Sequence, residues 1–146
     1  MTDLLNTFIP GKPVPQGKLV AGRFVKAHYP KHVTDYRAYV VGMIQQVWGR
    51  PAISDPVAVS VTYSMPRPKS HYRTGRKSHL LRDGAGILHT QTPDVDKLLR
   101  LTFDALALAG VIVDDKQVVQ VSAMKVWEPP PGGQLVVVSN ALVVES

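Results

Sequence analysis

The segment from Asp96 to Ala109, DKLLRLTFDALALA, constrains the fold more than any other part of the chain. It consists largely of good helix formers, carries an acid in its first turn, and is followed by Gly110, a common stop signal after a helix. Val111-Ile112-Val113 begins an extended stretch, and the chain then turns before QVVQVSAMKVW, residues 117–127, which predicts a strand. A helix leading directly into strands predicts a mixed α and β domain.

The rest of the sequence adds one more helix and three more strands. Helical spacing of apolar residues predicts a helix over 34–48, with Thr34 or Asp35 as its cap and Gly49 as its stop. Strands are predicted at 7–10, 57–63 and 134–144, and Pro129 to Gly133 predicts a turn. We therefore expect one α+β domain over residues 1–146, with a mixed sheet, two main helices and antiparallel hairpins at the C-terminus.

Composition excludes several classes of protein. The chain has 146 residues, 45% of them hydrophobic, which fits one globular domain. Cysteine is absent, which excludes disulfides and thiolate metal sites and favours a reducing cytoplasm. The first residues, MTDLLNTFIP, do not resemble a signal peptide, and no apolar run reaches the roughly 20 residues that span a membrane. We expect a cytoplasmic protein with no membrane partner.

Positive charge is concentrated in part of the chain. The net charge is +6, and no acid occurs between Pro56 and Arg82. The segment 65–91 carries six lysines and arginines and predicts a long, mobile, basic loop. Five of the eleven acids, in contrast, fall between Asp94 and Asp115. A basic surface around an acidic site is typical of a metal-dependent nuclease, although basic domains without a phosphate partner are also common.

Two pairs of acids flank the predicted helix 96–109. Asp94 and Asp96 are interpreted either as helix caps or as ligands of a hard divalent cation, which prefers several carboxylate oxygens. Asp114 and Asp115 are interpreted either as turn residues or as part of the same site. The helix is about 20 Å long, and an extended return to Asp115 covers roughly 17 Å. The second pair can therefore just reach the first, or meet the acids of a partner subunit.

Arg100 lies between two acids on one helix face. Asp96, Arg100 and Asp104 are spaced i, i+4 and i+8, which predicts either a surface salt-bridge ladder or an arginine that binds phosphate bidentately. The five histidines show no pair at helical spacing in a convincing helix, so we do not expect a zinc site.

The segment from Thr92 to Lys125, TPDVDKLLRLTFDALALAGVIVDDKQVVQVSAMK, resembles the RusA family of Holliday junction resolvases. That family shows D-x-D-N, a helix ending F-D-A-L, a glycine, D-D-x-Q-V and then a strand bearing lysine. The resemblance implies metal-binding acids at Asp94, Asp96 and Asp115, with Asp114 beside them. The family's catalytic helix lysine falls on Arg100, which keeps the charge but not proton donation, and the family's asparagine falls on Lys97.

The resemblance also implies a RusA-like fold, a homodimer and cleavage of four-way DNA junctions in recombination and repair, in a bacterial, phage or prophage setting. The cofactor would be Mg²⁺, with Mn²⁺ as a substitute, and the catalytic residues would be Asp94, Asp96, Asp115 and Arg100. The candidate DNA-binding residues are Lys97, Arg67, Lys69, Arg73, Arg76, Lys77, Arg82 and Lys125. Two alternatives remain open from the residues: a nuclease acting on flaps or forks, and a DNA-binding protein without activity.

Overall fold

The computed structural model describes residues 3–21 and 27–141. Its elements are β1 (Asp3–Pro10), α1 (Lys31–Val47), β2 (Val57–Pro66), α2 (Val95–Leu108), β3 (Val118–Glu128) and β4 (Gly133–Asn140). Single turns of 3₁₀ helix lie at Lys69–His71 (η1), Gly75–Lys77 (η2) and Asp115–Gln117 (η3). The predicted α+β fold with a mixed sheet and two main helices is confirmed.

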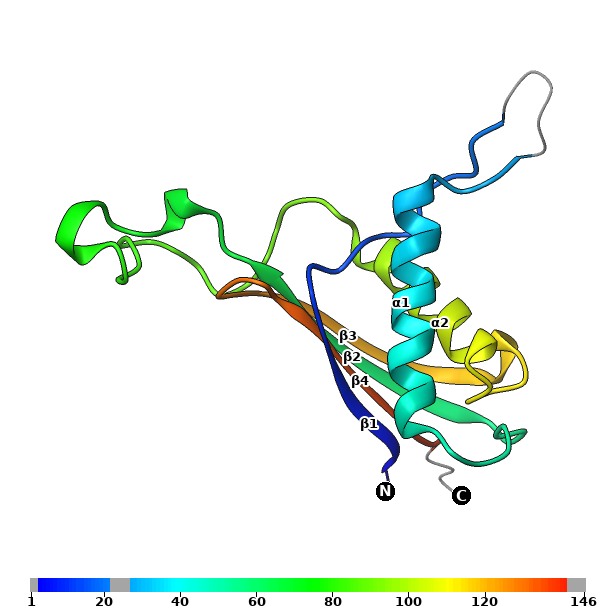
Figure 1. Cartoon of the computed structure of the whole chain (residues 1–146). Helices are drawn as coiled ribbons and strands as arrows, with labels where there is room; N and C mark the ends of the chain where they lie inside the picture. Colours follow the sequence, from blue (N-terminus) through cyan, green and yellow to red (C-terminus); the bar gives the residue numbers. More distant parts are fainter. Residues whose placement is uncertain (1–2, 22–26, 142–146) are drawn as a thin grey trace.

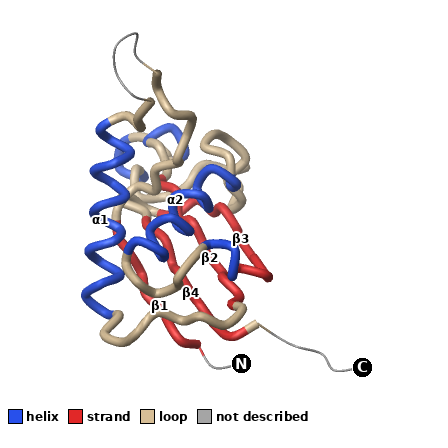
Figure 2. The backbone as a smooth tube through the Cα atoms, turned by 90° about the vertical axis from the view of Figure 1, so that its right-hand side faces the viewer, coloured by secondary structure: helices blue, strands red, loops and turns tan. Residues whose placement is uncertain are grey.

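The four strands form one sheet in the order β1-β4-β2-β3. β3 runs parallel to β2, whereas β4 is antiparallel to both β1 and β2. Both helices cover the same face of this sheet (Figures 1 and 2). Among the described residues, no helix is long and apolar enough to cross a membrane.

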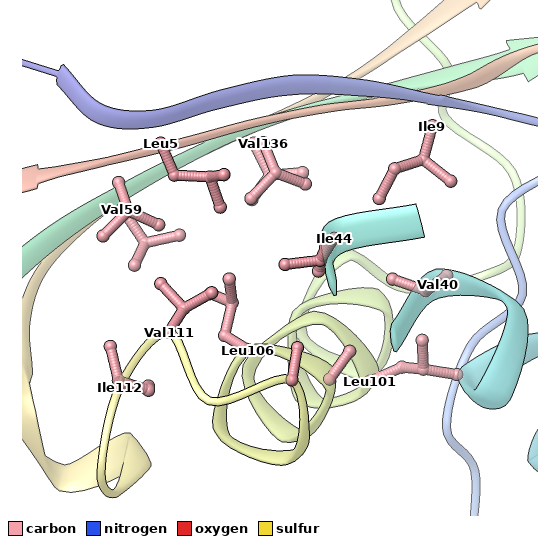
Figure 3. Close-up of a cluster of buried hydrophobic side chains, with 14 of the residues drawn as sticks. Leu5, Ile9, Val40, Ile44, Val59, Leu101, Leu106, Val111, Ile112 and Val136 are labelled. Carbon is pink, nitrogen blue, oxygen red and sulfur yellow. The ribbon is translucent and has the colours of Figure 1, made fainter. Parts of the chain in front are cut away.

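The core lies between the sheet and the two helices. β2 alternates strictly in its first half, so that Val57, Val59 and Val61 are buried while Ser60 is exposed. Figure 3 shows Val59 and Val136 of the sheet facing the helices, with Ile44 of α1 and Leu106 of α2 between them. Each such side chain contributes about 1.5–3 kcal/mol when fully buried. This packing fixes α2, whose first turn carries the acids of interest.

The helix boundaries differ from the prediction most at α1. Its N-cap is Pro30, and the predicted caps have other roles: Thr34 donates to the carbonyl of Lys31, and Asp35 accepts from its ammonium at 2.8 Å. The prediction of Thr34 or Asp35 as cap is therefore wrong, because proline starts the helix one turn earlier. α2 lies within one residue of its predicted bounds, and the chain leaves it through Gly110 at φ +81°.

The predicted C-terminal hairpin of β3 and β4 is also wrong, because β2 lies between them. To reach the far side of β2, the chain crosses its end at Gly132, which has φ +78°. A Cβ on Gly132 would lie 2.3 Å from the carbonyl oxygen of Ser64, so only glycine fits this crossing. β4 ends at Asn140; residues 142–144 of the predicted last strand lie outside the described residues.

Residues 67–90, hereafter the basic arm, project from one end of the sheet (green in Figure 1). The sequence predicts a long loop here, and the structure places only single 3₁₀ turns and isolated bridges in it. It contains η1 and η2, and its two limbs pair through Tyr72 and Leu81. Its base is tied to β3 by a bridge between Leu88 and Val126. Whether the basic arm is mobile stays a prediction.

Candidate active site

Asp94 and Asp96 lie at the start of α2 with their carboxylates uncommitted to capping. Asp94 occupies the N-cap position, yet its side chain makes no capping hydrogen bond. The Asp94 carboxylate instead lies 3.6 Å from the ammonium of Lys97, and both side chains are about half exposed or more. Asp96 is exposed in the first turn. The capping interpretation of Asp94 is therefore not supported, and two acidic groups are available to a ligand.

The loop before Asp94 is held in place by Lys125 on β3. The Lys125 ammonium donates to the carbonyl oxygens of Gln91 and Pro93, both at 2.8 Å. The backbone of the same strand accepts from the amide of His89 at 3.0 Å. Lys125, assigned to DNA from the sequence, thus anchors the segment that leads into Asp94. Nothing in the sequence marks this role, because the partners are backbone carbonyls far away along the chain.

Asp114 and Asp115 lie in a tightly hydrogen-bonded turn. Asp114 accepts from the amide of Lys116 at 2.9 Å, and the Gln117 side chain accepts from the amide of Asp114. The Lys116 amide is the main cause that lowers the pKa of Asp114. The pKa of Asp115 is raised by its hydrogen bond with Asp114, by burial, and by the negative charges of Asp114 and Asp104. Asp115 therefore lies in the field of Asp104, where a cation would be favourable.

Asp104 and Arg100 have different roles on α2. Asp104 accepts a 2.7 Å hydrogen bond from the side-chain amide of Gln16, which is 5% exposed. The backbone N–H of Gln16 donates to the carbonyl of Lys97, so the loop after β1 is held along α2. Arg100 is exposed, and in the described parts of the chain it forms no ion pair with Asp96 or Asp104. The salt-bridge ladder is therefore not observed, and the guanidinium is free for an anion.

The acids do not come together within one chain. Residues 3–21 and 27–141 contain no group of three or more acids or histidines that could hold a metal ion. Asp94 and Asp96 lie at the N-terminal end of α2, whereas Asp115 lies near Asp104, more than two turns further along the helix. One chain therefore does not provide a fitting Mg²⁺ site, and a convergence across two subunits stays a prediction.

A comparison of the sequence with models of known protein families identifies the family of this chain. The model of the family "Endodeoxyribonuclease RusA" matches residues 10–137. The chain belongs to the RusA endodeoxyribonuclease family. The match runs from the end of β1 into β4 and includes both helices and both acidic pairs. A comparison with curated proteins found no match. RusA membership implies a nuclease that acts on Holliday junctions.

The basic arm of this RusA-family chain carries cations that are available to DNA. Its exposed members are Lys69, Arg76, Lys77 and Arg82. Arg73 is half-buried and donates to the carbonyl of Leu81 and to Asp83, at 3.2 and 3.3 Å. Arg67 is only 8% exposed and donates to the carbonyl of Gly86 at 2.9 Å. Arg67, one of the candidate DNA-binding residues, is therefore buried, and a backbone carbonyl accepts a hydrogen bond from its guanidinium inside the base of the arm.

Proposed function

We propose that this chain is a Mg²⁺-dependent Holliday junction resolvase that acts as a homodimer. The observation that carries the proposal is the pair of exposed carboxylates, Asp94 and Asp96, about one turn of α2 before the exposed guanidinium of Arg100. Hard divalent cations prefer carboxylate oxygens, and a guanidinium matches the geometry of a phosphate. The arrangement therefore suits phosphodiester cleavage, in agreement with RusA membership.

The proposed dimer completes the acidic site. Within the described residues no third acid joins Asp94 and Asp96, and the negative charges of Asp114 and Asp104 near Asp115 favour a cation there. We infer that Asp115 of the partner subunit joins Asp94 and Asp96. An exposed apolar surface surrounds the turn that carries Asp115: Leu108 is 61% exposed, Val113 65% and Val119 59%. β3 is also the last strand of the sheet, and residues 87–89 pair with its outer edge only at the end far from Asp115, among the described residues. Such a surface is typical of a protein interface.

Cations on α2 and on the basic arm bind and orient the DNA. Arg100 and Lys97 are one turn apart on α2 and hold the phosphate nearest the acids. The exposed cations of the basic arm bind the backbone further from the cleaved bond, where contacts give position without sequence recognition. Two sites related by a two-fold axis suit a junction in which two strands are nicked.

Mixed dimers test the shared site directly. An Asp94→Asn subunit and an Asp115→Asn subunit, each inactive alone, are unfolded together and refolded at equal concentrations. A heterodimer then contains one intact site if the site is shared between subunits, and none if each site lies within one chain. Random pairing makes about half of the dimers mixed, so nicking should recover to about a quarter of the wild-type rate.

The control is a mixture of Asp94→Asn and Asp96→Asn subunits. These residues belong to the same side of the shared site, so no intact site forms in any dimer. Recovery in the first mixture and not in the control supports the shared site. Equal inactivity of both mixtures would contradict it.

A further inference from the structure

A cavity of about 740 Å³ opens beside the candidate active site. The loop after β1, the end of β2, the loop before α2, and β3 all contribute to its wall. Asp94 and Lys97 also line it, so the cavity adjoins the group of residues proposed to hold the phosphate. Its volume is in the usual range for a site that takes an organic ligand. In the proposed function, no part of the DNA occupies this cavity.

The inner wall of the cavity is aromatic and apolar. Trp127 lines it, and its indole contacts His89 with ring centroids 4.3 Å apart. On another side the same indole meets His71 in an edge-on contact at 4.6 Å, which fixes its orientation. Met65 and Val14 add apolar surface. A rigid indole at the wall of a cavity is a stacking platform for a flat ring.

His89 belongs to the same wall and lies against Trp127. The residue is 6% exposed, and its Nδ1 atom is fully buried, so this atom does not face the cavity. Burial and the nearby charge of Lys125 lower the pKa of His89, so the ring is neutral. The two rings therefore form an uncharged aromatic wall, which suits an uncharged flat ring.

The mouth of the cavity is basic. Lys12 and Lys97 line it and are exposed, so their ammonium groups can meet phosphates on either side of a ligand. An uncharged aromatic wall and two cations match a nucleotide, with its base inside and its phosphates outside.

We propose that this cavity receives one unstacked nucleobase of the branched DNA, next to the phosphate held at the candidate active site. This inference rests on the proposed function, because the base must belong to the strand being cut. A base at a branch point is the least costly to unstack, since its stacking and pairing are already weakened. Capture of that base fixes which phosphate reaches Asp94, and the fit of the base to the cavity gives the enzyme a sequence preference at the cut site.

Four-way junctions with one abasic site test the proposal. An abasic sugar replaces each base flanking the branch point in turn, and affinity is measured in EDTA so that no strand is cut. Stacking on an aromatic side chain contributes roughly five- to hundredfold per base. For wild type, one abasic position should therefore weaken binding by about tenfold. Trp127→Ala should bind the intact junction about tenfold more weakly, with no further loss at that abasic position.

Two more variants separate the cavity from general damage. Gly17 lines the cavity, and a Cβ there would meet no atom within 4 Å, so Gly17→Phe can narrow the cavity without strain in the fold. It should reproduce the effect of Trp127→Ala. Met124→Ala, on the same strand but 52% exposed on the sheet's other face, should behave like wild type.

The proposal is overturned if wild type is indifferent to every abasic position. It is also overturned if Trp127→Ala and Gly17→Phe lose the same additional affinity as wild type at the critical position. Either result, with preferential binding and nicking of the intact junction by wild type, leaves the proposed function standing. A wild-type protein that does not prefer the junction to matched duplex contradicts the proposed function itself.

Discussion

Substitution of Lys125 by methionine should slow cleavage far more than it weakens DNA binding. The change keeps the hydrocarbon stem and removes the two hydrogen bonds to the carbonyls of Gln91 and Pro93. Gln91 is exposed, so water can replace the ammonium there, whereas the bond to Pro93 is partly buried. One charged hydrogen bond contributes about 1.5–3 kcal/mol. We therefore expect a loss of about 1–2 kcal/mol in the free energy of unfolding, too little to unfold an ordinary domain.

The effect on cleavage should be larger because the loop positions Asp94. Loss of a group that orients a metal ligand typically costs about 10- to 100-fold in metal affinity or activity. We expect single-turnover nicking at saturating protein to fall by at least about tenfold. Lys125→Arg keeps a cationic donor and should recover part of the rate. Lys31→Met is the matched control, since the Lys31 side chain is 88% exposed and bonds only to Asp35 on its own helix.

The salt dependence of junction binding separates positioning from direct DNA contact. A lysine that neutralises one phosphate contributes about −0.9 to the slope of log affinity against log salt concentration. If Lys125 only holds the loop, Lys125→Met should leave this slope unchanged. A slope flattened by about one unit with an unchanged nicking rate would refute the positioning role and restore Lys125 to the DNA surface.

Three other perturbations follow from the structure. Replacement of the exposed cations Lys69, Arg76 and Lys77 by alanine should flatten the salt slope of junction binding by up to about three units, with little change in the nicking rate at saturating protein. Thr102→Val should lower the free energy of unfolding in urea by about 1–3 kcal/mol, because the buried Thr102 hydroxyl bonds to the Tyr63 hydroxyl and the Gln134 amide oxygen. The pKa of His89 is lowered from 6.5 in the folded state, so the unfolded chain binds the proton first. The stability that neutral His89 confers is thus present above pH 6.5 and lost as the pH falls below it, and His89→Gln should make this pH dependence shallower. An unchanged slope, urea midpoint or pH profile would count against the corresponding assignment.

Local sequence signals were sufficient for α2 and its neighbourhood. Helix formers, an acidic first turn and Gly110 placed α2 to within one residue, since each of these signals acts within a few residues of the chain. α1 was placed less well, because Pro30 starts it before the residues that looked like caps. The strand order could not be predicted, because the insertion of β2 between β3 and β4 depends on long-range pairing and on the crossing at Gly132.

Some residues of the candidate site could be identified from the sequence, whereas the roles of others appear only in the structure. The exposed acids and Arg100 were identified because the residue types and spacing carry the chemistry. The roles of Arg67 and Lys125 were not, because each cation bonds to carbonyl oxygens distant in sequence. Every residue carries a backbone carbonyl, so a hydrogen bond to one does not constrain the type of the accepting residue, and the sequence does not reveal it. The cavity beside Asp94 is assembled from several separate segments, and only the fold brings them together.

The central claim is that this RusA-family chain nicks four-way junctions with Mg²⁺ at a site containing Asp94 and Asp96. The most direct measurement is strand cleavage of a mobile synthetic four-way junction, beside matched linear duplex, flap and fork substrates, with and without Mg²⁺. We expect paired, symmetric nicks in the junction that require Mg²⁺. These nicks should disappear in Asp94→Asn, which should still bind the junction. Cleavage that is equal on flaps and forks, or that persists in Asp94→Asn, or the absence of any nick in the junction, would contradict it.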